Sequence, residues 1–195
     1  MKTTNEKILT AALSLFATKG YSETTMRDLA DMVGVVPGAI YKHYPGKYEV
    51  YQGVLIEMEK HEQRFWDRVN VPGGSPETNP EGYRNLSLED IEGFLRDMLH
   101  FWTSEAFPSA FRRMLTCRQY SSEEMSKTYQ HYFGTGPVVY LSWLLTGANV
   151  RNADGTALRL WSLVLLLMTL HDASGAHRAM RSRLDRMITE TIRQA

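Results

Sequence analysis

Basic and aromatic side chains gather in one short interval near the start of the chain. Between Met32 and Tyr48 the sequence has no carboxylate, yet the same interval contains Lys42, His43 and Lys47. The whole chain is neutral, with 22 basic and 22 acidic residues, so this positive charge is local. Lysine and tyrosine side chains suit contacts with phosphate oxygens and base edges. Such a patch is the electrostatic footprint of a duplex-binding element.

The elements that must carry these side chains are two short helices that meet at a glycine. The first begins at Thr25, whose hydroxyl can cap the free amides together with Asp28 three residues later. It ends at Gly34, which adopts a positive φ at little steric cost. The second runs from Pro37, a residue suited to a first helical turn, to about Tyr44. This spacing is typical of a helix-turn-helix.

The predicted pair of helices has an apolar side that packs and a polar side that faces outward. Four residues supply the apolar side: Leu29, Val33, Val35 and Ile40. Four residues are left facing outward: Gly38, Tyr41, Lys42 and His43. Lys47 and the amides at the start of the next helix can hold a phosphate, and Thr25 can do the same one helix earlier.

The remainder of the chain shows helical periodicity and no strand alternation. A first helix ends at Gly20, and residues 70–85 form a loop rich in proline and glycine. Six further helices are expected, with a break near Gly134 to Pro137: 47–69, 87–105, 108–120, 122–148, 156–173 and 176–193. The predicted fold class is all-α. An N-terminal three-helix helix-turn-helix DNA-binding domain (1–47) precedes a larger C-terminal helical domain (48–195).

The first fifty or so residues resemble the DNA-binding domain of the TetR family of transcriptional regulators. The resemblance rests on positions whose spacings agree at once: Phe16, Gly20, Thr24, Thr25, Gly34, Val35, Val36, Gly38, Ile40, Tyr41, His43, Tyr44 and Lys47. Val36 stands where the family usually has serine, so the recognition helix loses a side-chain cap worth on the order of 1 kcal/mol. Tyr44 stands where the family usually has phenylalanine, which is a structurally mild change.

The resemblance implies a role for each matching residue. It places five residues near phosphates: Thr25, Gly38, Tyr41, His43 and Lys47. It places four nearer to base edges: Arg27, Pro37, Ala39 and Lys42. It also implies a homodimer whose two recognition helices lie about 34 Å apart, one for each half of a pseudo-palindromic operator. Which of these residues determines the DNA sequence that is recognised stays open.

Beyond residue 50 the resemblance implies only architecture, a helical ligand-binding domain that dimerises through its last two long helices. Residues 156–173 are compatible, since they carry more apolar surface than one side of a small bundle can cover. Aromatic and methionine side chains at helical spacing could line a pocket for an apolar or aromatic effector, with polar groups to orient it. The candidates are Trp66, Phe94, Met98, Phe101, Trp102, Phe111, Met114, Arg118, Tyr129, Phe133, Trp143 and His171. Any of these rings could instead be plain core.

Other classes of protein find little support in the sequence. A glycine-rich phosphate loop, an HExxH motif and a nucleophile elbow are all missing, and Cys117 has no histidine nearby in sequence, so no enzyme is expected. No metal site is expected, because the adjacent His171 and Asp172 point to different sides of a helix. No cofactor is expected either. A single cysteine and the lack of a signal peptide indicate the cytoplasm. The apolar run Leu158 to Leu170 is about 13 residues long against roughly 20 for a bilayer, which predicts a buried helix rather than a membrane anchor.

We therefore expect a cytoplasmic, homodimeric, ligand-responsive regulator. In its simplest form it is a repressor that binds a double-stranded DNA operator and is released from it by a small apolar or aromatic effector. Activation is compatible with the same sites. The alternative is a helical structural or partner-binding protein without operator recognition, for which the missing serine at Val36 is the only hint.

Overall fold

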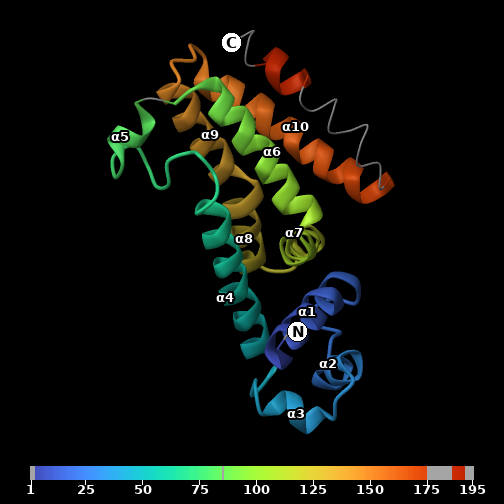
Figure 1. The fold of residues 1–195 in the computed structure, drawn as a ribbon. Helices are drawn as coiled ribbons and strands as arrows, with labels where there is room; N and C mark the ends of the chain where they lie inside the picture. Colours follow the sequence, from blue (N-terminus) through green and yellow to red (C-terminus); the bar gives the residue numbers. More distant parts are fainter. Residues whose placement is uncertain (1–2, 85, 175–185, 192–195) are drawn as a thin grey trace. The chain divides into compact units, whose positions relative to one another are not determined.

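The computed structural model describes residues 3–84, 86–174 and 186–191, and all the regular elements in these ranges are helices (Figure 1). The chain divides into two compact units. The first contains residues 1–65 and 105–127, and the second contains residues 66–104 and 128–195. This division concerns packing alone, so the functional boundary expected at Lys47 stays a prediction.

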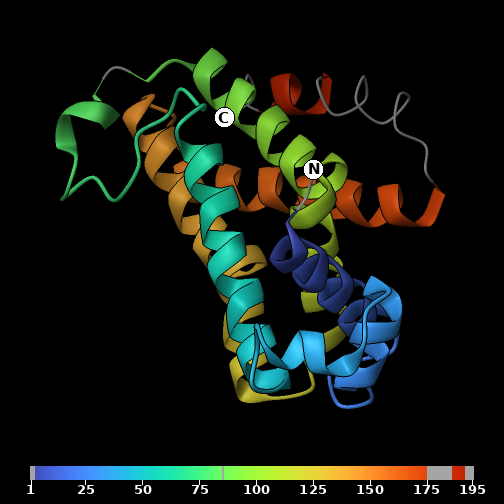
Figure 2. The same ribbon diagram turned by 60° about the horizontal axis from the view of Figure 1, so that its bottom comes forward.

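The first unit joins the N-terminal helices to a segment from the middle of the chain. It contains α1 (Thr4–Thr18), α2 (Met26–Val33) and α3 (Pro37–Tyr41), followed by all but the last residue of α4 (Lys47–Trp66). It also contains α7 (Ala106–Arg118). α1 packs against both α2 and α7, and α2 packs against α3 (Figure 2). α1 is the central helix of this unit because apolar residues occupy most of its circumference, and these are fully buried: Ile8, Ala12, Leu13 and Phe16.

The second unit has a leucine-rich core. Its main helices are α6 (Leu88–Ser104), α9 (Thr135–Gly147) and α10 (Ala153–Ser174), and the short α5 (Pro80–Tyr83) rests on α9. α10 packs against both α9 and α6. The buried core includes Leu95, Leu141, Leu144, Leu145 and Leu160. α8 (Glu123–Phe133) begins in the first unit and ends in the second.

Capping groups set the ends of the N-terminal helices as the sequence predicts. The N–H of Asp28 donates to the Thr25 hydroxyl at 3.1 Å, and the N–H of Thr25 donates to the Asp28 carboxylate at 2.7 Å. α2 ends at Gly34, which has φ 77°, and Gly20 follows α1 with φ 103°. Both glycines therefore adopt the left-handed conformation that other residues rarely do.

Several element boundaries differ from the prediction by a few residues, among them the start of α10 at Ala153 rather than 156. α3 ends at Tyr41 rather than Tyr44, because the residue before a proline is disfavoured in the helical region and Pro45 follows. α4 ends at Trp66, about one turn before the predicted end. The predicted loop 70–85 contains the short helix α5, in which the N–H of Gly82 donates to the side-chain oxygen of Asn79 at 3.2 Å.

The predicted break in the long helix is present and separates α8 from α9 at Gly134. Pro137 lacks the N–H that a continuous helix would donate to the carbonyl of Phe133. The indole N–H of Trp161 on α10 donates to this carbonyl instead, at 2.8 Å. The carbonyl that the break leaves without a backbone donor therefore accepts a hydrogen bond from a side chain of another helix of the second unit.

The C-terminal part of the chain is described only in part. The helix expected over residues 176–193 lies mostly outside the described residues, although 186–191 are helical and Ile188 is buried. By length and composition, Ala153–Ala173 could cross a membrane, with mean hydropathy 1.4. Core helices of soluble proteins pass the same test, and 44% of its most apolar window is buried, so this is weak support for a span.

Candidate nucleic-acid interface and neighbouring cavity

The α2–α3 pair is held together by the side that the sequence predicts to be apolar. Leu29 and Ile40 are fully buried, whereas Val33 and Val35 are half-buried. The N–H groups of Gly34 and Val35 both donate to the carbonyl of Ala30, at 2.9 and 3.0 Å. Ala30 is itself fully buried, so a small residue stands where the two helices approach. These contacts confirm the helix-turn-helix.

The opposite side of the pair is open to solvent. The predicted DNA contacts that are exposed are Thr25, Arg27, Gly38, Tyr41, Lys42 and His43. Those that are half-buried are Pro37, Ala39 and Lys47. Tyr41 keeps 52% of its surface exposed, which leaves its ring free to reach another molecule. The assignment of these residues to phosphates and bases stays a prediction.

The start of α3 lacks a side-chain cap. Val36 has the extended backbone of an N-cap residue, with φ −72° and ψ 147°, and its side chain is 71% exposed. Valine has no oxygen to accept from the free N–H groups that follow. The consequence expected from the missing serine is therefore seen in the structure.

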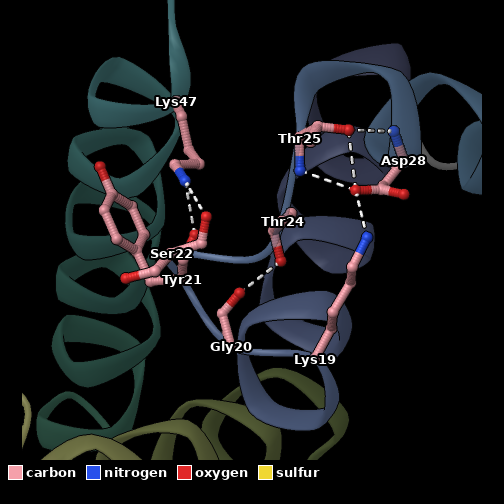
Figure 3. A network of polar contacts seen from close by, with 8 residues as sticks. All are labelled: Lys19, Gly20, Tyr21, Ser22, Thr24, Thr25, Asp28 and Lys47. Carbon is pink, nitrogen blue, oxygen red and sulfur yellow. Dashed lines mark hydrogen bonds and ion pairs between the residues drawn. The ribbon is translucent and has the colours of Figure 1, made fainter.

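Lys47, at the start of α4, holds the loop between α1 and α2 (Figure 3). Its Nζ donates to the carbonyl of Tyr21 at 2.6 Å and to that of Ser22 at 2.9 Å. The same ammonium lies 4.6 Å from the centroid of the Tyr21 ring. Two of its three N–H donors are therefore engaged within the protein, and one remains for a phosphate. The sequence did not predict this bracing role.

A second polar network fixes the start of α2 (Figure 3). One carboxylate oxygen of Asp28 accepts from Lys19 at 2.7 Å and from the N–H and hydroxyl of Thr25 at 2.7 and 2.8 Å. The Lys19 hydrogen bond, followed by those from Thr25, lowers the pKa of Asp28 to about 2. The buried Thr24 hydroxyl donates to the Gly20 carbonyl at 2.6 Å. The Thr25 hydroxyl is thus already engaged before any phosphate arrives.

The predicted effector-binding residues fall into separate groups. In the second unit, Trp66 stacks on Phe94 with ring centroids 5.9 Å apart, and Tyr140 meets both rings at 5.4 Å. Trp143 lies 6.5 Å from Tyr140. The Tyr140 hydroxyl donates to the Pro72 carbonyl at 2.7 Å, and burial raises the pKa of Tyr140. Tyr140 is the member of this group that sequence reasoning missed, although it lies three residues before Trp143.

A second aromatic group in the same unit surrounds Trp102. The ring of Trp102 lies 4.8 Å from those of Phe101 and Phe133, and Tyr129 lies 5.5 Å from Phe133. The indole N–H of Trp102 donates to the sulfur of Met98 at 2.9 Å. These residues come together as predicted, and whether they line a binding pocket stays a prediction.

His171 lies on α10, and its Nδ1 is 3.8 Å from the carboxylate of Asp172. Adjacent residues on a helix usually diverge, but these two side chains approach each other, so the expectation that they point to different sides is wrong. His171 remains a predicted effector contact.

The last three predicted effector residues belong to the first unit. Phe111 is fully buried in α7. Met114 and Arg118, further along α7, line a cavity of about 250 Å³. Tyr21, Tyr48 and Tyr51 line the same cavity and were not predicted. The spacing of Tyr48 and Tyr51 on one helix was an available signal, but their approach to α7 depends on the fold.

Comparisons with known proteins agree with this geometry. Residues 8–54 match a family described as bacterial regulatory proteins, tetR family. The HTH-type transcriptional regulator SrpR of Pseudomonas putida is 44% identical over 56 residues, which cover 29% of this chain and 26% of that protein. The HTH-type transcriptional repressor KstR2 of Mycolicibacterium smegmatis is 36% identical over 87 residues, 45% of this chain and 42% of that protein. The match thus spans less than half the length of these relatives.

Among solved structures, similarity extends along nearly the whole chain. A TetR-like transcriptional regulator from Rhodococcus sp. RHA1 has a TM-score of 0.67, covering 95% of this chain and 93% of that one. The two sequences are 18% identical, so this likeness concerns the fold alone.

Proposed function

We propose that this chain is a transcriptional regulator of the TetR type that acts by binding a DNA duplex, not by catalysis, since residues 8–54 match the tetR family of bacterial regulatory proteins. One observation carries the proposal. α2 and α3 are joined at the left-handed Gly34, and Tyr41, at the end of α3, is exposed together with the following Lys42 and His43 in an interval without carboxylates. A helix of this kind fits the major groove, where side chains can read base edges.

We propose that the active species is a homodimer built on α10. Leu158, Leu166 and Leu170 are 58%, 54% and 42% exposed, and their spacing in multiples of four puts them along one side of the helix. Fully burying an exposed leucine side chain is worth about 1.5–3 kcal/mol, so covering each of these half-exposed leucines stabilises an interface by roughly half of that. A second copy of the chain would cover this stripe and supply the second recognition helix that a pseudo-palindromic operator requires.

The proposed regulation is repression that a small apolar or aromatic effector relieves in the cytoplasm. The two aromatic groups of the second unit, around Tyr140 and Trp102, offer rings and a thioether that suit such a ligand. An effector that binds better to the arrangement with wrongly spaced recognition helices lowers the population able to bind DNA. The size of this population shift depends only on the difference in the effector's affinity for the two arrangements.

Selection of duplexes from a random library by the purified chain tests this function. We expect enrichment of a palindromic site, bound with an affinity that falls as salt rises. Tyr41→Ala should abolish this binding with little change in the unfolding midpoint, because about half of the ring is exposed. Tyr120→Ala, at a tyrosine that is 92% exposed outside α2–α3, serves as the matched control and should bind normally.

Two results would contradict the proposal. If no duplex is enriched at low ionic strength, the alternative of a partner-binding helical protein is favoured. If Tyr41→Ala unfolds the protein, Tyr41 belongs to the core and not to the interface.

A further inference from the structure

The first unit contains a cation that lacks a partner. Arg118, the last residue of α7, is half-buried, and its Nε is buried without a hydrogen-bond partner. Among the residues that the structure describes, neither a carboxylate nor a hydrogen-bond acceptor pairs with its guanidinium. A guanidinium N–H that is buried without an acceptor is costly to leave unpaired. An anionic acceptor would satisfy this N–H and neutralise the charge as well.

The guanidinium is held in a fixed place. It lies directly against the backbone of Gly20, where an added Cβ would stand 1.5 Å from Nη2. Gly20 has φ 103°, a backbone conformation that glycine adopts readily. This packing keeps the head of Arg118 at the wall of the cavity of about 250 Å³. A preorganised charge of this kind binds a ligand at a lower entropic cost.

The rest of the cavity wall is mostly apolar. Tyr21, Tyr51, Met114 and Met125 contribute flat rings and thioethers. The volume equals about eight water molecules at about 30 Å³ each. It is slightly below the usual range for drug-sized ligands, about 300–1,000 Å³. A molecule with one or two rings is the size that fits.

We propose that this cavity binds a small hydrophobic monocarboxylate, preferably aromatic, whose carboxylate pairs with Arg118. A planar carboxylate matches the fork of a guanidinium through two parallel hydrogen bonds. Glu124 also lines the cavity, and Arg118 is its only lining cation in the described chain, so a dianion such as phosphate is disfavoured. The proposal concerns binding alone and does not depend on the proposed binding of DNA.

Calorimetric titration of the full chain with benzoate and 2-naphthoate, each compared with its uncharged amide, tests the site. A charge-assisted pair should make the carboxylates bind about tenfold or more tighter than the amides. Arg118→Met should remove this preference without lowering the unfolding midpoint in the absence of ligand, because it removes an unpaired charge. Arg113→Met, at an exposed arginine on the same helix, is the matched control and should keep the preference.

A second measurement needs no variant. The Nε–H resonance of Arg118 should move when benzoate or 2-naphthoate is added and stay in place with the amides. The proposal fails if neither acid binds, if acid and amide bind wild type equally, if Arg118→Met keeps the preference, or if the Arg118 resonance does not respond.

Discussion

Replacing Lys47 with methionine should destabilise the fold as well as weaken duplex binding, because this lysine braces the α1–α2 loop. The substitution removes hydrogen bonds of 2.6 and 2.9 Å to two carbonyls and a cation that lies 4.6 Å from the Tyr21 ring. Hydrogen bonds to charged groups contribute about 1.5–3 kcal/mol each, less where solvent screens them. One of the two is exposed, so we expect a loss of about 2 kcal/mol in total. For a chain of this size the unfolding midpoint should fall by about 4–8 °C.

Thermal unfolding and duplex titration over a range of salt concentrations separate the two roles of Lys47. Lys42→Met is the matched control, since Lys42 is exposed and no hydrogen bond is described for its side chain within the described residues. Each phosphate contact that is lost should reduce the salt slope by about 0.9. Lys42→Met should change duplex binding without changing the unfolding midpoint. If Lys47→Met unfolds within about 1 °C of wild type, the bracing argument is refuted.

Three further perturbations probe other features. Val36→Ser should supply the missing cap of α3 and stabilise by about 1 kcal/mol, raising the midpoint by about 2–4 °C, whereas Val36→Ala should bring no such gain; equal midpoints for the two would contradict the capping account. The pKa of Asp28 is lowered from 3.8 to about 2 by Lys19 and Thr25, so the stability from its charged form is present above pH 3.8 and lost as the pH falls toward 2. Asp28→Asn should reduce the pH dependence of the free energy of unfolding in that pH range. An unchanged pH dependence there would argue against this role of Asp28. Leu166→Glu should place a charge in the proposed dimer interface and give monomers in sedimentation experiments. A dimer that persists in this variant would show that α10 does not form that interface.

The sequence predicts the helix-turn-helix well because its determinants are local. Thr25 and Asp28 stand three residues apart, and the left-handed turn depends on Gly34 alone. Hydrogen bonds between residues close in sequence fix the ends of these elements. The ends of α3 and α4 were less well predicted, since helix ends depend on competing contacts of the following residues.

The bracing lysine and the cavity could not be predicted, because both join segments that are distant in sequence. Lys47 and Tyr21 are 26 residues apart, and nothing in either local pattern indicates that they meet. The sequence alone favours an ordinary surface position for Arg118, because its packing on Gly20 depends on the fold. Likewise, the helix break at Pro137 was visible in the sequence, but the indole of Trp161 that compensates for it was not.

The close packing of Gly20 and Arg118 constrains how this chain can change over evolution. A larger residue at position 20 would collide with the guanidinium as well as adopt an unfavourable φ. Substitutions at the two positions should therefore show epistasis. Alanine at position 20 would be tolerated better in a protein whose residue 118 already has a short side chain. Divergent homologues that lose this arginine should be the lineages in which the glycine is also free to drift.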